Sequence, residues 1–451
     1  MARRPSHVQV AQRSVRLGLL GLGTVGSGVL EVLARNRGDI ERRLGHGIEV
    51  TRILVRDPER PRSPLVARDL LTTSADAIFA DPEIRIVVEV MGGCGDARTH
   101  MLRALKSGRA VVTANKDAMA EHASELFAAA AAGGGPGIFF EASVGGGIPI
   151  VRAVQDSLAA NRLRRIAGIL NGTTNYILSR MGRDGATLEA ALAQAQTHGY
   201  AEADPSADLD GLDAARKLCI LSSLAYGTRC RLADVHCEGI RAVHPVDIAH
   251  AARMGWVVKL LAISELVDER VSMRVHPAFL PLDHPLAAVH DAFNGIFVQG
   301  DAVGEAMFYG RGAGALPTAS AVLGDVMEAV RGLDGAPPRR DCTRLHHRPA
   351  ARMDAVVSRF YMRLRVPDRV GVLARIAHVL GRAGVSILSV LQGPVSTPGA
   401  VARGADDGLA ELVIVTHAVR DAAMRRAVAG LQRLDVVVGV GAVVRLAPED
   451  L

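Results

Sequence analysis

The residues best suited to chemistry lie near the middle of the chain, where an acidic loop runs into a helix that carries one lysine. Glu202 and Asp208 lie in the loop, and Asp213 and Lys217 follow within the predicted helix 211–225. At 100° per residue, Lys217 lies in the middle of the apolar face of this helix. A cation there can stabilise negative charge that develops on a substrate oxygen, and the carboxylates suit an ammonium group.

Two structural explanations of Lys217 compete with a catalytic one. The side chain can bury its aliphatic stem and reach water with its ammonium group. It can also pair with Asp213 one turn earlier and so stabilise the helix. The stretch alone does not separate these explanations from catalysis, so the surrounding elements must decide.

A glycine-rich turn near the start of the chain predicts a nucleotide-binding fold. The strand Val15–Leu20 is expected to run into Gly21-Leu22-Gly23-Thr24-Val25-Gly26, and an amphipathic helix follows to about Asn36. This G-x-G-x-x-G spacing provides a tight turn, a close backbone approach to a pyrophosphate and a glycine at the helix–strand contact. The free N–H groups of the helix suit an anion. Predicted cofactor contacts are therefore Gly21, Gly23, Thr24, Val25 and Gly26.

The second predicted strand, Ile48–Val55, ends at Arg56 and Asp57. A carboxylate at this position binds a ribose hydroxyl of NAD, whereas an arginine favours the 2′-phosphate of NADP. Because Arg56 comes first, we expect NADP, and NAD stays open.

The strand–helix alternation continues with strands Ile84–Val90, Arg109–Thr113 and Ile138–Glu141. Ligands of an open parallel sheet gather outside the carboxyl ends of its strands. Lys116 follows such an end, so we expect it beside the cofactor; a lysine that starts a helix and faces water is the alternative. The run Gly145–Gly147 can bind an ion or ligand through its backbone, or act as a hinge.

A second lobe is predicted after residue 150, where the regular alternation breaks. A strand at 164–170 ends in the polar run Asn171–Tyr176, which suits helix capping or ligand contact. The cluster Gly310–Gly314 precedes a last helix, from Thr318 to about Arg331, and either brings Gly314 close to the cofactor or only makes a turn. Further strands are expected near 257–263, 271–275, 295–299 and 306–309.

The end of the chain is predicted to form a small separate sandwich. Residues 333–352 are rich in Gly, Pro and basic side chains, which is typical of a linker. Beyond them, strands and helices are expected in the order βαββαβ between Phe360 and Arg445. The predicted domains are therefore 1–150, 151–332 and 353–451.

The composition is that of a globular protein with two or three domains, since one core does not extend over 451 residues. Aromatic residues make up only 3%, which leaves no platform for stacking nucleic-acid bases, and the net charge of +6 is small. Five scattered cysteines without a C-x-x-C pair argue against a disulfide framework. Because neither a signal-peptide core nor a membrane-spanning run is found, we expect a cytoplasmic protein without nucleic-acid or membrane partners.

From about Val15 to Leu446 the chain resembles the monofunctional bacterial homoserine dehydrogenases that end in an ACT domain. The resemblance implies an α/β protein with an N-terminal Rossmann domain, an α+β substrate and dimerisation domain, and a C-terminal βαββαβ ACT domain. Its motifs, in the order of the family, are the glycine turn, Ala114-Asn115-Lys116, Glu141-Ala142-Ser143-Val144-Gly145, Asn171-Gly172-Thr173-Thr174-Asn175, Gly199-Tyr200-Ala201-Glu202-Ala203-Asp204-Pro205 and Asp210-Gly211-x-Asp213-x-Ala215-x-Lys217.

The resemblance implies reversible reduction of L-aspartate 4-semialdehyde to L-homoserine with NADPH or NADH, on the route to threonine, methionine and isoleucine. Lys217 would be the acid/base lysine, and Lys116 would contact both cofactor and substrate. The remaining implied contacts are Glu202, Asp213, Asp208 and Gly199 for the substrate, and Gly314 for the cofactor.

The resemblance also implies a monovalent cation, an effector and an oligomer. Sodium would be held mainly by the backbone carbonyls of Glu141, Val144, Gly146 and Ile148. The loop with Asp368 and Gly371 is similar to the ligand loop of ACT domains, so feedback inhibition by threonine and a homodimer or homotetramer are expected. Two departures from the family are Trp256, in place of a smaller aromatic residue, and a Gly/Ala-rich insertion at 396–407.

Two other functions stay open on the sequence. One is a different Rossmann oxidoreductase that acts on another aldehyde or imine of an amino acid. The other is an amino-acid sensor without catalysis; the set Lys116, Glu202, Asp213 and Lys217 argues against it, since a sensor needs no lysine within an apolar helix face.

Overall fold

The computed structural model describes residues 14–333, 341–395, 408–448 and 451. The chain forms two compact units, which are considered separately below. The first contains residues 1–157 and 311–342, and the second contains 158–310 and 343–451. The predicted division at residues 150, 332 and 352 stays a prediction, and the insertion at 396–407 lies outside the described residues.

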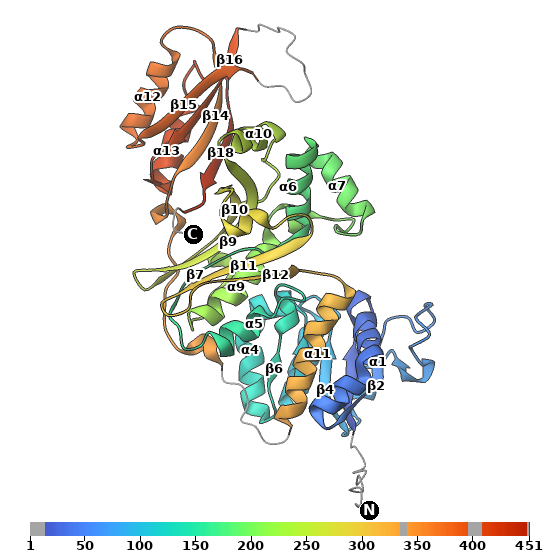
Figure 1. The fold of residues 1–451 in the computed structure, drawn as a ribbon. Helices are drawn as coiled ribbons and strands as arrows, with labels where there is room; N and C mark the ends of the chain where they lie inside the picture. Colours follow the sequence, from blue (N-terminus) through green and yellow to red (C-terminus); the bar gives the residue numbers. More distant parts are fainter. Residues whose placement is uncertain (1–13, 334–340, 396–407, 449–450) are drawn as a thin grey trace, which may run out of the picture. The chain divides into compact units, whose positions relative to one another are not determined.

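The first unit is built on a six-stranded sheet, and every pair of neighbouring strands is parallel (Figure 1). The strand order is β3-β2-β1-β4-β5-β6, which is that of the Rossmann fold, and its topological switch point lies at β1 and β4. The strands are β1 Ser14–Leu20, β2 Gly47–Leu54, β3 Leu71–Thr72, β4 Ile84–Glu89, β5 Ala110–Thr113 and β6 Ile138–Phe139.

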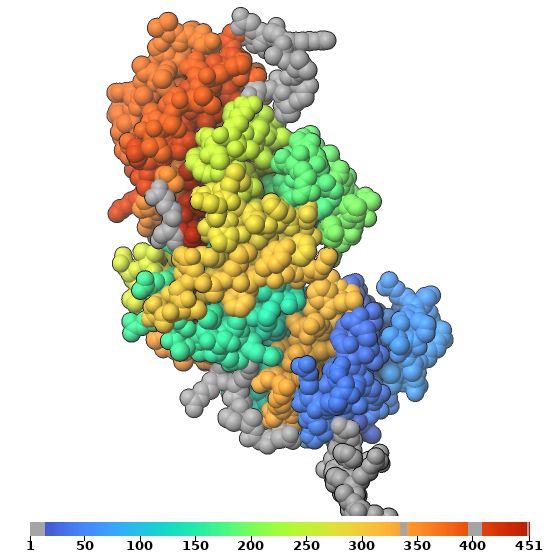
Figure 2. Space-filling model, in the orientation of Figure 1, coloured from blue at the N-terminus to red at the C-terminus, as the bar shows by residue number. Residues whose placement is uncertain are grey.

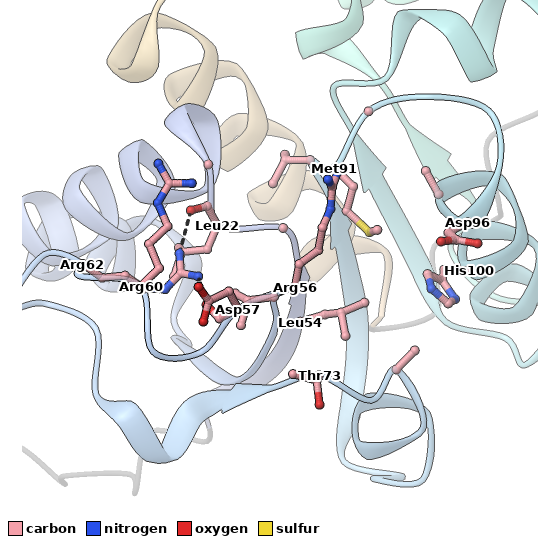
Figure 3. A pocket seen from close by; sticks show the side chains of 17 residues that line it. Leu22, Leu54, Arg56, Asp57, Arg60, Arg62, Thr73, Met91, Asp96 and His100 are labelled. Carbon is pink, nitrogen blue, oxygen red and sulfur yellow. Dashed lines mark hydrogen bonds between the residues drawn. The ribbon is translucent and has the colours of Figure 1, made fainter.

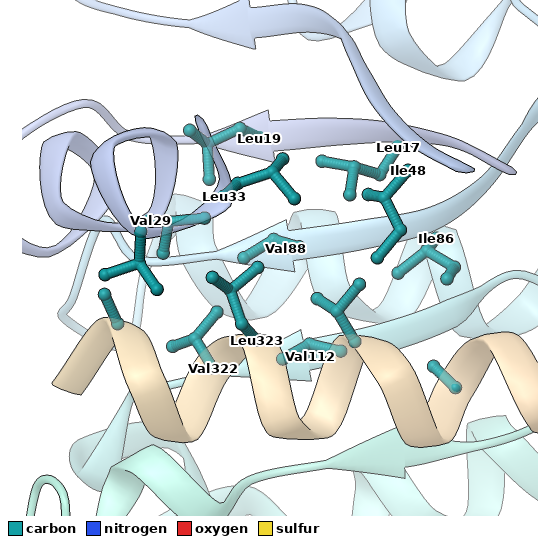
Figure 4. Close-up of a cluster of buried hydrophobic side chains, with 14 of the residues drawn as sticks. Leu17, Leu19, Val29, Leu33, Ile48, Ile86, Val88, Val112, Val322 and Leu323 are labelled. Carbon is teal, nitrogen blue, oxygen red and sulfur yellow. The ribbon is translucent and has the colours of Figure 1, made fainter. Parts of the chain in front are cut away.

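Two helices far apart in the sequence, α1 and α11, pack together on this sheet. Figure 4 shows Val29 and Leu33 of α1 and Val322 of α11 against the buried side chains of β1, β4 and β5. Gly28 permits the contact, because a Cβ atom there would lie 2.6 Å from the carbonyl oxygen of Ala315. The helices of this unit are α1 Thr24–Leu44, α2 Asp76–Phe79, α3 Asp96–Lys106, α4 Lys116–Gly133, α5 Ile150–Arg152 and α11 Ala315–Gly332.

The second unit is organised around one ten-stranded sheet that joins the central part of the chain to its C-terminal part. The path through the sheet is β12-β11-β7-β9-β10-β18-β14-β16-β15, and β8 also pairs with β10. The central strands are β7 Leu163–Ile169, β8 His236–Cys237, β9 Trp256–Val267, β10 Arg270–Pro281, β11 Phe293–Gly300 and β12 Gly304–Arg311. The accompanying helices are α6 Gly172–Asp184, α7 Leu188–Thr197, α8 Ser206–Leu209, α9 Leu212–Ala225 and α10 Pro245–Arg253.

The C-terminal part is the βαββαβ sandwich that the sequence predicts. In Figure 2 most of its residues, orange to red, gather in one lobe. Its last strand, β18, runs parallel to β10 with Ala278 opposite Arg445, so this lobe continues the central sheet. The elements are β13 Val357–Ser358, β14 Phe360–Pro367, α12 Val372–Arg382, β15 Ile387–Pro394, β16 Leu409–Thr416, β17 Val419–Arg420, α13 Asp421–Leu431 and β18 Gly439–Leu446.

The fold class is confirmed, and several predicted boundaries are wrong. The two strands expected near 257–263 and 271–275 are twelve residues each, β9 and β10, joined by Asp268 and Glu269 in the left-handed region with φ of 48° and 58°. The strand expected to reach Glu141 ends at Phe139, and a 3₁₀ turn follows. The helix α10 was not predicted. None of the helices in the described residues combines the length and the apolar character needed to cross a membrane.

Candidate functional site

The glycine turn after β1 has the geometry that a dinucleotide requires. Gly21 has φ of 101°, and a Cβ atom there would lie 3.0 Å from the carbonyl oxygen of Val90. A Cβ on Gly26 would lie 2.4 Å from the oxygen of Gly21, so the helix can start this close to the strand only with glycine. Around Gly23 a Cβ would meet no atom within 4 Å. The first and third glycines thus serve the protein's own packing, and the second leaves its backbone open to a ligand.

A cavity of about 840 Å³ lies beside this turn (Figure 3). Figure 3 shows Arg60 and Arg62 near Asp57 on one side of it, and Asp96 and His100 on the opposite side. Arg62 donates to the carbonyl oxygens of Leu22, at 3.1 Å, and Asp57, at 2.8 Å, so it ties the loop after β2 to the glycine turn.

Arg56 and Arg60 are exposed at this cavity and suit an anionic group. Sequence reasoning named Arg56 but missed Arg60 and Arg62. The signal for them was present, since three arginines lie within the eight residues that follow β2.

Buried polar side chains fix the carboxyl edge of the sheet next to the cavity. The fully buried carboxylate of Glu89 accepts hydrogen bonds from the N–H groups of Met91 and Gly92 and from the hydroxyl of Thr113. Asn115 caps α4 by accepting from the N–H of Ala118 at 2.9 Å, and it donates to the carbonyl oxygen of Gly93 at 2.7 Å. Lys116, the first residue of α4, is half-buried at this edge.

The segment from Glu141 to Ile148 turns sharply at Gly145 and Gly146, which have φ of 72° and 56°. The buried carboxylate of Glu141 accepts from the N–H groups of Val151 and Arg152 at 2.8 Å each, and burial raises the pKa of this carboxyl. Oxygen ligands are what a hard cation prefers. Since the carboxylate is occupied by these N–H groups, a cation here would be held by backbone carbonyls, with the carboxylate as a nearby negative charge. The residues fit a monovalent cation in this way.

Gly314 lies at the N-terminal end of α11 with φ of 119°. A close turn there requires glycine, since this φ is rarely adopted by other residues. Its contact with the cofactor stays a prediction.

The second unit contains a buried polar network around Lys217. The ammonium group donates to the carboxylate of Asp213 at 2.7 Å and to the carbonyl oxygen of Leu170 at 2.8 Å. Only 12% of the Lys217 side chain and 6% of the Asp213 side chain are exposed. The i,i+4 pair is therefore present, but the lysine does not reach out into water as a snorkelling side chain would.

Asn171 links this pair to the acidic loop. Its amide nitrogen donates to Asp208 at 2.6 Å and to Asp213 at 2.8 Å, and its amide oxygen accepts from the N–H of Thr174 and so caps α6. One side chain at the carboxyl end of β7 thus orients both carboxylates towards the same place. Sequence reasoning identified the polar run at 171–176 but gave Asn171 no role of its own.

Glu202 and Gly199 lie in the loop after α7. The carboxylate of Glu202 is exposed and forms no hydrogen bond or ion pair within the described residues, so it is available to a ligand. Gly199 has φ of 72°, and the neighbouring Tyr200 packs on Tyr176 with ring centroids 5.1 Å apart. Thr173 donates to the carbonyl oxygen of Tyr200 at 2.6 Å, which holds this loop beside the network.

The loop with Asp368 and Gly371 lies in the C-terminal lobe. Asp368 accepts from the side-chain amide of Gln392 at 3.0 Å. Gly371 has φ of 89° and precedes α12. The roles predicted for all these site residues stay predictions, and the structure gives each a definite place.

A Rossmann sheet with an open glycine turn, together with a second unit that holds a lysine among carboxylates, defines a nicotinamide-dependent oxidoreductase.

The comparisons with known proteins identify the family within this class of oxidoreductases. Family models described as the NAD-binding domain of homoserine dehydrogenase, homoserine dehydrogenase and the ACT domain match residues 21–140, 149–327 and 360–431. A homoserine dehydrogenase of Synechocystis is 45% identical over 96% of this chain and 99% of its own length.

Two solved structures agree with this assignment. The crystal structure of a homoserine dehydrogenase from Thiobacillus denitrificans is 39% identical, with a TM-score of 0.89 over 97% of this chain and 99% of that one. A hyperthermophilic archaeal homoserine dehydrogenase in complex with NADPH is 28% identical, with a TM-score of 0.61 over 72% of this chain and 100% of that one. The chain belongs to the homoserine dehydrogenase family and is an oxidoreductase that acts on a CH–OH group.

Proposed function

We propose that the protein reduces L-aspartate 4-semialdehyde reversibly to L-homoserine with NADPH, on the route to threonine, methionine and isoleucine. The observation that carries this proposal is the buried network of Lys217, Asp213, Asn171 and Asp208. It combines one cation with carboxylates in the way that an amino acid with a reacting oxygen requires.

The chain's own residues explain how reduction is assisted. The nicotinamide ring, when bound, supplies the hydride. As negative charge develops on the aldehyde oxygen, the ammonium group of Lys217 stabilises it and supplies a proton. Asp213 keeps that ammonium group in place, since it lies 2.7 Å away.

The substrate's own ammonium group needs carboxylates, and those of the second unit differ in how far they are buried. Asp213 and Asp208 are held by Asn171, whereas Glu202 is exposed on the loop that begins at Gly199. We assign Glu202 and Asp213 to the substrate, Asp208 to the support of Asp213, and Lys116 to both the cofactor and the substrate.

The preference for NADP follows from charge at the cofactor cavity. Arg56 and Arg60 are exposed there, and arginine binds phosphate by charge-assisted hydrogen bonds. The archaeal relative was solved with NADPH, which supports the same choice.

A sodium ion in the Glu141 segment would order the turn that leads into α5. The carbonyl groups of Glu141 and Ile148 already accept the N–H groups of Val144 and Ile150, and each oxygen has a second lone pair for a cation. Thermal unfolding in sodium chloride and in choline chloride at equal ionic strength tests this site. A higher midpoint in sodium is expected, and equal midpoints would contradict it.

Threonine is the proposed effector of the C-terminal lobe, and the structure offers a route from that lobe to the acidic loop. Arg445 of β18 donates to Asp421 at 2.6 Å and to Glu238 at 2.8 Å. Three residues beyond Glu238, Arg241 pairs with Asp210 at 2.5 Å. Strain in the lobe can thus reach Asp210, which lies between α8 with Asp208 and α9 with Asp213.

A homodimer or homotetramer is proposed from the edge of the C-terminal sheet. β15 is an edge strand, and its side chains Leu388, Val390 and Leu391 are 47%, 39% and 56% exposed. An exposed apolar edge strand is a template for pairing with another chain, so a second copy is the expected occupant.

Initial rates of L-homoserine oxidation test the central proposal, with NADP⁺ and NAD⁺ compared as cofactors. L-Serine and L-threonine serve as control substrates, since each has a hydroxyl but a different carbon chain. We expect turnover with L-homoserine, a higher kcat/KM with NADP⁺, and inhibition by added L-threonine. Faster oxidation of either control substrate would overturn the substrate assignment.

A further inference from the structure

We propose a zinc site in the first unit, formed by the side chains of Cys94, Glu121 and His122. Their ligand atoms all lie within 4.8 Å of one another, and the Sγ of Cys94 lies 3.9 Å from a carboxylate oxygen of Glu121. Within the part of the chain that the structure describes, this is the one such group of three metal-binding side chains.

The three ligand types are those that zinc uses. A thiolate, an imidazole and a carboxylate bind Zn²⁺ at about 2.0–2.3 Å, which places the ligand atoms of a tetrahedral site roughly 3.3–3.8 Å apart. The observed separations need only small side-chain movements to reach that range. Hard cations such as Mg²⁺ or Ca²⁺ bind oxygen ligands rather than thiolates, so the site favours softer divalent ions.

The backbone that carries these ligands is held in place by other contacts. Cys94 lies in the loop between β4 and α3, where Glu89 binds the N–H groups of Met91 and Gly92, and Asn115 binds the oxygen of Gly93. Asn115 also caps α4, the helix that carries the other two ligands. One side chain therefore fixes the loop against the helix, so the backbone positions of the three ligands are set without a metal, and only their side chains need to adjust.

Solvent can reach the site, as metal exchange requires. Glu121 is exposed, and Cys94 and His122 are half-buried. Three protein ligands leave a fourth position of the tetrahedron to water or to a bound molecule. A polar surface contact between Cys94 and Glu121 would explain one pair, but it does not explain why an imidazole joins them.

A zinc ion there would connect the cofactor loop to α4. Met91 and Gly92 of the same loop line the 840 Å³ cavity, together with Asp96, the first residue of α3, and Lys116 is the first residue of α4. Because the ion binds the folded form, it is expected to raise the thermal midpoint of the protein.

The test uses the full chain, stripped of metal with a chelator and kept in a non-thiol reductant. Zn²⁺ binding is measured by calorimetry, and Co²⁺ is added separately to detect a thiolate-to-cobalt charge-transfer band. We expect one ion per chain, the charge-transfer band, and a higher thermal midpoint with Zn²⁺. Cys94→Ser and His122→Ala are expected to weaken binding by ~30-fold or more, because loss of a mere supporting partner already costs about 10–100-fold.

Glu125→Gln is the matched control, since Glu125 lies one turn further along α4 and pairs with Arg98 instead. It should retain zinc affinity. NADP⁺ binding by each variant without metal verifies that the nucleotide fold is intact, and Glu121→Gln, at an exposed position, replaces any variant that fails this check. Wild-type zinc affinity in Cys94→Ser, or a Co²⁺ spectrum without the thiolate band, would overturn the proposal.

Discussion

The two units prepare for their ligands in opposite ways. In the first, the glycine turn offers bare backbone to a ligand: nothing lies within 4 Å of a Cβ placed on Gly23, and the exposed Arg56 lies at the cavity. In the second, Lys217, Asp213 and Asn171 already satisfy one another in a buried network. An open site gains contacts when its ligand binds, whereas a satisfied network must exchange contacts.

This difference has a chemical reason. A pyrophosphate is recognised by N–H groups and fixed positive charge, which need no rearrangement. A catalytic lysine must keep its charge and direction in a buried place before the substrate arrives, and an unpaired buried charge is costly. The second unit pairs Lys217 with Asp213, and under the proposed function the substrate would compete for the same carboxylate.

The replacement of Lys217 tests the role of the second unit and has the largest expected effect on turnover. Lys217→Ala is expected to lower kcat by at least ~100-fold, the scale of a lost general acid. NADP⁺ affinity, which depends on the first unit, should stay close to wild type. Steady-state rates of L-homoserine oxidation and a separate cofactor titration measure the two effects.

Lys106→Ala is the matched control for this change, because Lys106 is an exposed lysine at the end of α3. It should leave turnover unaltered. Near-wild-type turnover in Lys217→Ala would remove the lysine from the chemistry and leave it a structural partner of Asp213.

The open cavity is tested by removing its charge. Arg56→Ser is expected to raise the KM for NADP⁺ by ~10-fold and the double variant with Arg60→Ser by ~100-fold, since a hydrogen bond to a charged group contributes about 1.5–3 kcal/mol. The KM for NAD⁺ should change little, because NAD⁺ has no 2′-phosphate.

Arg52→Ser supplies the control for the arginine variants. Arg52 is exposed on β2 and does not line the cavity. An equal rise of KM for NADP⁺ and NAD⁺ in Arg56→Ser would show that the arginine serves the whole dinucleotide and would end the argument for NADP preference.

The sequence predicted the first unit far better than the second because its signals are local. The strand, the glycine turn and the helix of Gly21–Gly26 adjoin one another, and each restricts the next. The Lys217 helix was also predicted with nearly correct ends, since its apolar face is continuous.

Contacts between distant segments had no such signal. The bonds from Asn171 to Asp208 and Asp213 depend on how the end of β7 meets the acidic loop, and the sequence did not predict them. The strands predicted for the β9–β10 hairpin were too short, because Asp268-Glu269 lacks the Asn-Gly pattern that marks a tight turn. Nothing in the local pattern indicated that β18 would pair with β10 and carry Arg445 to Glu238.

The contact between Arg445 and Glu238 gives a further prediction about the second unit, with a smaller expected effect. Burial opposes ionisation of Glu238, but its bonds to His236 and Arg445 outweigh burial and hold the pKa of this carboxyl below its usual range. Glu238→Gln removes the charge, and we expect the threonine concentration for half-inhibition to rise ~5-fold, at the low end of coupling between sites. Rates are compared with the variant's own uninhibited rate.

Glu305→Gln changes an exposed carboxylate of β12 and is the control. Unaltered threonine inhibition in Glu238→Gln would mean that the Arg445 link is structural. The effector would then act by another route, such as pairing between copies of the chain.

The smallest expected effect on turnover concerns the second buried lysine of the same unit, Lys259. Its ammonium group donates to Asn175 at 3.1 Å and to the carbonyl oxygen of Val289, and burial lowers its pKa to about 8 despite the nearby Asp291. The unfolded chain, with a pKa near 10.5, binds more protons between these two values. Stability therefore rises with pH across that window, by at most ~1.4 kcal/mol per pH unit.

Lys259→Met removes the titrating group and with it the contribution of Lys259 to the rise of stability with pH. Urea unfolding of both proteins at several pH values from 7 to 11 measures this contribution: the stability of the wild type relative to Lys259→Met should increase as pH rises through the window. A parallel pH dependence in the two proteins would mean that Lys259 stays charged when buried. Turnover near wild type in Lys259→Met would then separate the two buried lysines, one beside Asp213 for chemistry and the other beside Asn175 for the fold.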